Sequence, residues 1–241
     1  MKWANPYASR RDRMIIEQLA ARGVSDRRVL DAMRHVPREA FVPEGLRDAA
    51  YDDSPLPIGE GQTISQPYIV GAMMQALGLQ GNENVLEIGT GSGYGAAVLA
   101  HVARTVHTIE RIPSLARRAR ETLRRLGYDS VQVIDGDGSL GWAPAAPYDA
   151  IVATAEAPRI PASLRAQLKP GGRLVMPVAD PACGQALIRM VRGDDGKDRV
   201  ENIQSVRFVP LIGAEGWSDE KEAWRAREAM VGHAASRLGR R

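Results

Sequence analysis

The chain of 241 residues contains a single cysteine, Cys183, and only four histidines. One cysteine cannot form an internal disulfide and has no second cysteine at metal-ligand spacing, so we expect neither a disulfide framework nor a zinc site. The histidines form no HExxH or similar pattern, and we therefore expect no metal ion. So little cysteine fits a reducing compartment, and we expect the protein in the cytoplasm.

Long apolar runs and strong net charge are also missing. No stretch approaches the ~20 residues that span a bilayer, and the start MKWANPYASRRDR lacks the apolar core of a signal peptide, so we expect no membrane partner. A formal net charge of +3 is weak evidence for nucleic-acid binding, and we expect none. Apolar residues make up 44% of the chain and charged residues 25%, which is the balance of a globular protein.

What the sequence does contain, from residue 84 onward, is a regular alternation of strand and helix patterns. In chain order these patterns cover residues 84–89, 93–103, 105–110, 113–127, 131–138, 148–155, 161–172 and 173–178. Such alternation predicts an α/β fold of the doubly wound, Rossmann-like kind, with a mostly parallel sheet covered on both faces. Two further apolar runs, at 185–193 and 203–211, predict an antiparallel edge.

The N-terminal part is predicted to be helical. Residues 11–22 form an amphipathic pattern that Gly23 closes, and a second helix follows, with Ser25 as its N-cap and Pro37 as its stop. A third helical pattern runs over residues 67–78.

The segment VLEIGTGSGYG carries the strongest chemical signal. Gly89, Gly91 and Gly93 follow a strand directly and open a helix, which lets the backbone approach a ligand at the carboxyl end of the sheet. The register ExGxGxG, with Glu87 at the strand end, favours S-adenosylmethionine, because the ammonium and sulfonium of that cofactor gain from a nearby carboxylate. A dinucleotide would instead place its pyrophosphate at the helix N-terminus, so a dehydrogenase is the weaker alternative.

Acidic residues also end the next two strand patterns. Glu110 lies about 20 residues beyond the glycine loop, where an acid normally holds ribose hydroxyls. Asp137 and Gly138 follow the third strand pattern, where an adenine contact and an ordinary turn explain them equally well.

The acceptor side of the site is less obvious. No [ND]PP[YF] tetrapeptide of nitrogen-methylating enzymes follows the fourth strand pattern, which continues as TAEAPRIP. Ahead of the third helix lies the nearly uncharged stretch SPLPIGEGQTISQPY, whose hydroxyl and amide groups are the remaining candidates.

Five segments, in the same order over roughly residues 10–217, resemble the protein-L-isoaspartate O-methyltransferase family: YDDSPLPIGEGQTISQPY, VLEIGTGSGYG, GDGSLGW, LKPGGRLVMPV and FVPLIG. The QTISQP loop is specific to that family. The resemblance implies methyl transfer from S-adenosylmethionine to the free carboxylate of isoaspartyl residues in damaged proteins, with S-adenosyl-L-homocysteine as the second product. It also implies that Ser65 is the active-site serine. The implied cofactor contacts are Gln62, Thr63, Ile64, Ser65, Glu87, Gly89, Thr90, Gly91, Ser92, Gly93, Glu110, Arg111, Asp137 and Gly138.

The chemistry of the reaction also suits a hydroxyl group, such as that of Ser65, on the acceptor side of the site. A carboxylate is already ionised at neutral pH, so the enzyme needs no general base and must instead orient the acceptor and exclude water. A cap of the following helix is an alternative role for Ser65.

The chain departs from the family pattern at two places. Glu156 stands where a small alanine is usual, on the expected substrate side, and Gly95 stands where bacterial members often have glutamine. Two other functions therefore stay open: methylation of a dedicated peptide or another carboxylate, and a non-catalytic adaptor that binds isoaspartyl proteins.

Three parts of the chain are expected. Residues 1–80 form a helical arm and the substrate and cofactor loop, packed on the main domain; residues 81–217 form the S-adenosylmethionine-binding domain; residues 218–241 form a helical tail. We expect a monomer or a weak dimer.

Overall fold

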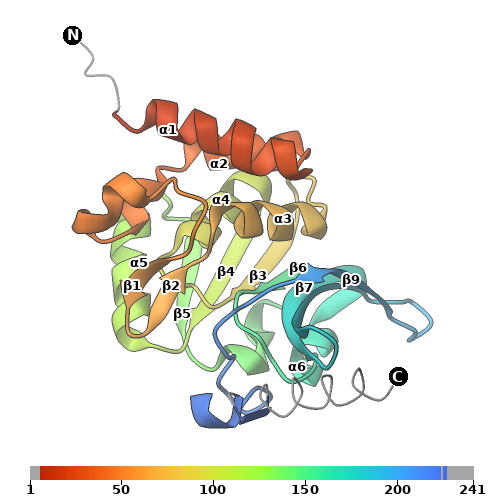
Figure 1. Ribbon diagram of the computed structural model, residues 1–241. Coiled ribbons are helices and arrows are strands. Elements are labelled where there is room, and N and C mark those ends of the chain that lie inside the picture. The colour runs from red at the N-terminus through yellow and green to blue at the C-terminus, as the bar shows by residue number, and fades with distance from the viewer. Residues whose placement is uncertain (1–5, 224, 227–241) are drawn as a thin grey trace, which may run out of the picture.

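The computed structural model describes residues 6–223 and 225–226. One sheet of seven strands forms its centre, in the order β5-β4-β3-β6-β7-β8-β9 (Figure 1). The strands are β3 Asn84–Ile88, β4 Thr105–Glu110, β5 Val131–Asp135, β6 Tyr148–Ala153, β7 Leu168–Asp180, β8 Gly184–Val191 and β9 Arg199–Ser205.

The strand order confirms the predicted doubly wound fold. Strands β5, β4, β3, β6 and β7 run parallel, whereas β7, β8 and β9 pair antiparallel at one edge. The chain leaves β3 toward β4 and β5 and then returns to place β6 on the other side of β3. The strand order therefore reverses between β3 and β6, which is where open α/β sheets bind their ligands.

Successive residues of the central strands enter two different hydrophobic cores. On β3, Val85 packs into the first core and Leu86 into the second; on β6, Val152 packs into the first and Ile151 into the second. Because side chains alternate across a strand, the two cores cover opposite faces of the sheet. The near-continuous apolar strand patterns of the sequence follow from this burial on both faces.

Helices supply the rest of both cores. They are α1 Ala8–Arg13, α2 Arg27–His35, α3 Pro67–Leu77, α4 Tyr94–Val102, α5 Pro113–Arg125 and α6 Ala162–Ala166. In Figure 1 the N-terminal helices lie above α3 and α4, with the sheet below them and α6 on the far side. The first core is continuous from Met14 through Met33 to Leu99, so the N-terminal helices share it with the sheet. The three-part domain division stays a prediction.

The predicted N-terminal helix changes its winding along its length. It begins as α1, continues as a π-helix over Met14–Leu19 and ends as a 3-10 turn over Ala20–Arg22. Gly23 ends it with φ 92°, a left-handed conformation that glycine adopts without a Cβ penalty.

Three boundaries differ from the prediction. The N-cap of α2 is Asp26, whose carboxylate accepts from the main-chain N–H of Arg28 and Val29, so Ser25 is not the cap. The last strand was placed too late: β9 ends at Ser205, and residues 206–211 leave the sheet. Phe208 and Leu211 of this run are buried in the two hydrophobic cores, and Pro210 forms only an isolated parallel bridge with Glu156. The helix pattern at 161–172 is likewise shorter, because β7 begins at Leu168.

The stretch expected to be a loop before α3 contains a β-hairpin. Strand β1, Leu56–Gly59, pairs antiparallel with β2, Gln62–Ile64. Helix α5 holds this hairpin, since Arg118 Nη2 donates to the Ile58 carbonyl at 2.8 Å and Ser114 Oγ donates to Glu60 at 2.7 Å. Arg118 of α5 is therefore a structural contact of the hairpin.

Between these elements lie short 3-10 helices: η3 Arg38–Phe41, η4 Glu44–Ala49, η5 Gly138–Leu140 and η6 Ala143–Ala145. The predicted C-terminal helix begins at residue 220, and most of it falls outside the described residues. Among the helices that are described, none is long and apolar enough to cross a membrane.

Candidate active site

A pocket of about 900 Å³ opens at the carboxyl ends of the parallel strands, at the reversal between β3 and β6. Its floor comes from the segments that follow these strands, and one wall comes from the hairpin strand β2 and the start of α3. The opposite wall is the chain that leaves β9, residues 204–212. A volume of this size suits a nucleotide-sized ligand together with part of a second substrate.

Glu87 is the buried carboxylate of the pocket. It is 1% exposed and accepts a hydrogen bond from Thr108 Oγ1 at 2.6 Å, and Thr108 in turn is bonded to Thr90 Oγ1 at 2.7 Å. Burial raises the pKa of Glu87 to about 8; repulsion from Glu110 adds to this rise and the Thr108 bond opposes it. The free protein therefore holds Glu87 mostly protonated at neutral pH, and a cation beside it would favour the ionised form.

Gly95 explains how the Glu87 carboxylate fits in this place. A Cβ atom at Gly95 would overlap Glu87 Oε1 directly. The first turn of α4 thus leaves a notch that the carboxylate occupies. The glycine that departs from the family pattern has a steric reason in this chain, because a larger residue would displace Glu87.

Glu110 ends β4 beside the glycine loop. Its two carboxylate oxygens accept from main-chain N–H groups, Oε2 from Gly91 at 2.8 Å and Oε1 from Ile112 at 3.0 Å. Each oxygen keeps a further lone pair for a ligand. The same carboxylate therefore shapes the glycine loop and faces the pocket.

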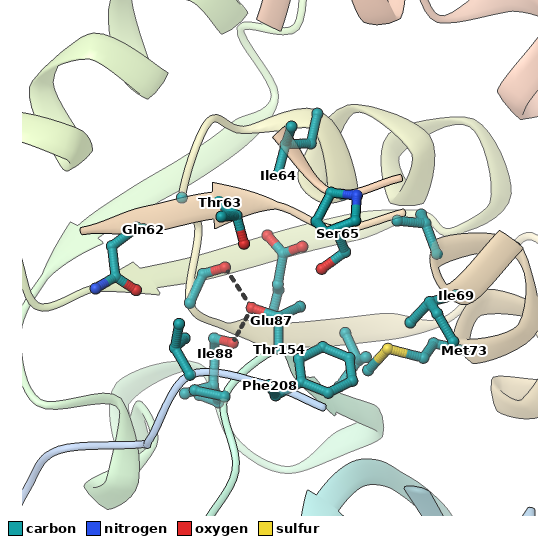
Figure 2. Close-up of a pocket in the computed structure, with 18 of the residues that line it drawn as sticks. Gln62, Thr63, Ile64, Ser65, Ile69, Met73, Glu87, Ile88, Thr154 and Phe208 are labelled. Atoms are coloured by element: carbon teal, nitrogen blue, oxygen red, sulfur yellow. Dashed lines mark hydrogen bonds between the residues drawn. The ribbon is translucent and has the colours of Figure 1, made fainter. Parts of the chain in front are cut away.

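Ser65 lies on the opposite wall, between β2 and α3. The N-cap of α3 is Gln66, and no side chain caps that helix, so the helix-cap role for Ser65 is excluded. The Ser65 hydroxyl forms no hydrogen bond with the part of the chain that the structure describes. Figure 2 shows it directed into the pocket, as is the Thr63 hydroxyl, with the Glu87 carboxylate between this wall and Thr154.

The structure brings most of the predicted site residues to this one pocket. Those that line it are Gln62, Thr63, Ile64, Ser65, Glu87, Gly89, Thr90, Gly91, Ser92, Glu110, Arg111 and Gly138.

Two predicted residues do not reach the pocket surface. Gly93 is the N-cap of α4 with φ 91°, and a Cβ there would press on Leu123 of α5. The Asp137 carboxylate accepts from the Ser139 hydroxyl at 2.7 Å and from the Ala214 main chain at 2.7 Å, which ties two loops together. Local turn chemistry accounts for both residues, and their cofactor contacts stay predictions.

Glu156 is not where a substrate would meet it. Its side chain is fully buried, accepts from Trp217 Nε1 at 3.1 Å and does not line the pocket. The position of Glu156 therefore does not support the expected placement on the substrate side. Glu156 instead anchors the segment that forms the far wall, which it also meets through main-chain bonds with Val209 and Leu211.

Sequence reasoning missed several lining residues. They include Tyr94, Met73 and most of the wall at 204–212, with Phe208 labelled in Figure 2. The quoted segment FVPLIG was the available signal, but an apolar run with a proline was interpreted as a strand.

A Rossmann-like sheet with a glycine loop at its switch point and two strand-end carboxylates in one pocket defines a class I S-adenosylmethionine-dependent methyltransferase. The family model of protein-L-isoaspartate(D-aspartate) O-methyltransferase matches residues 10–216. The chain belongs to this family.

Individual relatives agree with the family model. "Protein-L-isoaspartate O-methyltransferase 1" of Rhodopseudomonas palustris (strain HaA2) is 60% identical over 215 residues, which cover 89% of this chain and 88% of the relative. A solved protein-L-isoaspartate O-methyltransferase shares the fold with a TM-score of 0.75 at 29% identity, over 86% of this chain and 67% of that one. A structure from Plasmodium falciparum in complex with S-adenosyl-L-homocysteine has a TM-score of 0.72 at 24% identity, over 86% of this chain and 99% of that one.

Proposed function

We propose that this protein transfers a methyl group from S-adenosylmethionine to the free carboxylate of isoaspartyl residues in damaged proteins. The resulting ester cyclises to a succinimide that reopens in part as normal aspartate, which makes the reaction a repair. The observation that carries the proposal is that the Ser65 hydroxyl, which caps no helix, faces the same pocket as the buried carboxylate of Glu87.

The residues of the pocket fit the cofactor. Glu87 would hold the ammonium of its methionine part, because a cation relieves the cost of ionising a buried carboxylate. Glu110 would accept from the ribose hydroxyls with the lone pairs that its two main-chain bonds leave. When bound, the cofactor supplies an electrophilic methyl group on a sulfonium.

The pocket wall that contains Ser65 needs to orient the carboxylate of the methyl acceptor rather than to activate it. The acceptor is ionised at neutral pH, so no proton has to be removed before attack. The Ser65 hydroxyl would donate to one oxygen and leave the other to attack, and the buried side chains of Ile64 and Phe208 would keep water out. A neutral donor holds the carboxylate without the strong ground-state stabilisation that a direct ion pair would give.

We propose that the protein is located in the cytoplasm, because a chain with a single cysteine fits a reducing compartment. We also propose that the protein is a monomer or a weak dimer. We propose further that it binds neither nucleic acid nor membrane. Light scattering on the purified protein, with and without S-adenosyl-L-homocysteine, measures the oligomeric state.

The decisive experiment is methyl transfer from radiolabelled S-adenosylmethionine to two peptides that differ only in isoaspartate against aspartate. We expect label in the isoaspartyl peptide alone, released by mild base as methanol. Label in both peptides, or in free small acids, would indicate a broader carboxyl methyltransferase. Cofactor binding without label in either peptide would favour the adaptor.

A further inference from the structure

Arg38, in η3, is a fully buried arginine. Its side chain is 0% exposed, and none of the carboxylates in the described ranges forms an ion pair with it. The adjacent Glu39 is already engaged, since it pairs with Arg11 at 3.4 Å and accepts a short hydrogen bond from the Tyr51 hydroxyl. The positive charge of Arg38 is therefore not balanced locally.

The guanidinium is fixed by neutral groups instead. Nε donates to the Ala50 carbonyl at 2.6 Å, Nη2 donates to the Ser65 carbonyl at 2.7 Å, and Cζ lies 4.8 Å from the centroid of the Tyr94 ring. The remaining nitrogen, Nη1, lacks a hydrogen bond of good geometry among the described residues, and the neutral Tyr94 hydroxyl also acts on the guanidinium. Because Ser65 and Tyr94 both line the pocket, Arg38 lies directly behind the pocket wall on the acceptor side.

A buried cation without a counterion is costly, and main-chain carbonyls and an aromatic face offset only part of that cost. Its field is weakly screened inside the protein and extends into the neighbouring pocket. A negatively charged ligand bound beside Ser65 would balance the positive charge of Arg38. The two pocket carboxylates do not do so, since Glu87 and Glu110 lie at the strand ends and the charge acting on Glu87 is that of Glu110.

We propose that Arg38 is a positioning residue for the acceptor: it fixes Ser65 through its carbonyl and attracts the substrate carboxylate from behind the wall, without touching it. This inference rests on the proposed function, because it assigns an anionic acceptor to the Ser65 side of the pocket. The indirect placement has a chemical reason. A guanidinium in contact would occupy the oxygen lone pairs needed for attack, whereas a charge one layer away raises the local concentration of the anion and leaves both oxygens free.

The test compares an isoaspartyl peptide with its isoasparaginyl counterpart, which has the same shape and no charge. Binding of both is measured in the presence of S-adenosyl-L-homocysteine, and the ratio of the two Kd values reports the preference for the anion. Methyl transfer to the isoaspartyl peptide is measured in parallel.

We expect the wild type to prefer the anion, and Arg38→Met to reduce that preference about tenfold, as for two unit charges several ångströms apart in a partly buried site. Arg38→Lys should keep most of the preference but lower kcat, because a lysine retains the charge and cannot make the same bonds to two carbonyls. Cofactor affinity should be unchanged in both. If Arg38→Met does not fold, Arg38→Gln gives the same comparison.

Arg173 provides a matched control. It also donates to two main-chain carbonyls, Leu77 at 2.7 Å and Gly78 at 3.2 Å, but it lies outside the pocket lining and within 3.9 Å of Glu83. Arg173→Met should leave the anion preference intact. The inference would be overturned if folded Arg38→Met kept the wild-type preference for the anion. It would also be overturned if Arg38→Lys and Arg173→Met lost as much of that preference as Arg38→Met. Anion preference lost in Arg38→Met without any methyl transfer by the wild type would instead refute the proposed function alone.

Discussion

On the floor of the pocket, at the ends of β3 and β4, two carboxylates lie nearly enclosed by protein, Glu87 and Glu110. On the hairpin side, the segment from Gln62 to Ser65 presents hydroxyl and amide groups, with the buried cation of Arg38 behind it. The two sides thus carry opposite charge, matched to a cationic cofactor and an anionic acceptor. Glu87 and Glu110 lie in the pocket lining itself, whereas Arg38 lies behind it; an acceptor that must react cannot also be held in a tight ion pair.

The largest effect is expected from Ser65→Ala, which removes the donor of the acceptor side. We expect kcat to fall about a hundredfold, the usual cost of losing one oriented donor in a reacting site, while cofactor affinity stays the same. Steady-state methyl transfer and calorimetric titration with S-adenosyl-L-homocysteine measure the two quantities.

Ser114→Ala is the matched control for Ser65, since it removes a hydroxyl bond to Glu60 at the tip of the same hairpin. It should leave turnover nearly unchanged, because Ser114 does not line the pocket and a surface substitution usually changes stability by no more than about 0.5 kcal/mol. If Ser65→Ala lost turnover and cofactor affinity equally, Ser65 would belong to the cofactor side of the pocket. The hairpin would then not form a separate acceptor side.

Glu110→Ala should weaken cofactor binding about tenfold or more, because it removes charge-assisted hydrogen bonds and leaves the Gly91 amide without its acceptor. Asp135 ends the adjacent strand and pairs with Arg120 at an exposed position, so Asp135→Ala is a fitting control with no expected loss. Calorimetry decides, and unchanged binding in Glu110→Ala would refute the ribose assignment.

Folding stability and cofactor affinity should both depend on pH through Glu87. Its pKa of about 8 in the free protein lies above that of an unfolded glutamate, so the folded state holds an extra proton between about pH 4.5 and 8. Glu87 therefore favours folding at low pH, and this contribution is lost as the pH rises to 8. Cofactor affinity should change in the opposite direction and rise toward pH 8, as the carboxylate ionises to meet the ammonium.

Glu87→Gln should abolish both trends, raising Tm near pH 8 while lowering cofactor affinity. Thermal melts and titrations at several pH values measure them together. A wild-type protein whose affinity is flat from pH 6 to 8.5 would contradict the proton-holding Glu87.

The smallest catalytic effect is expected at Glu156. Glu156→Ala should destabilise the fold by about 1–3 kcal/mol, because it leaves the buried Trp217 indole N–H without this acceptor. Glu156→Gln keeps an acceptor oxygen and should lose less. Denaturant unfolding gives the stability, and a changed KM for the isoaspartyl peptide would show that Glu156 does act on the substrate.

The sequence predicted the parallel sheet well, because burial on both faces leaves apolar strands that alternate with helical periods. Most of the residues predicted to contact the cofactor line one pocket, since a glycine loop and the acids at strand ends have fixed positions in this topology. It did not predict the hairpin, whose strands have four and three residues and contain Pro57, which is too short for a periodic signal. The wall after β9 differs from the prediction for a related reason: an apolar run has the same pattern in a strand and in a buried segment outside the sheet.

The chain by itself determined the order of strands and helices, the glycine loop and the carboxylates that follow β3 and β4, because backbone freedom and hydrophobic periodicity are local properties. Tertiary structure alone decided that Glu87 fills the notch at Gly95, that Glu156 turns away from the pocket and that Arg38 lies buried behind Ser65. Burial and charge balance depend on which distant segments pack together. The role of a charged side chain in this protein is therefore fixed by its neighbours in space and not by its neighbours in sequence.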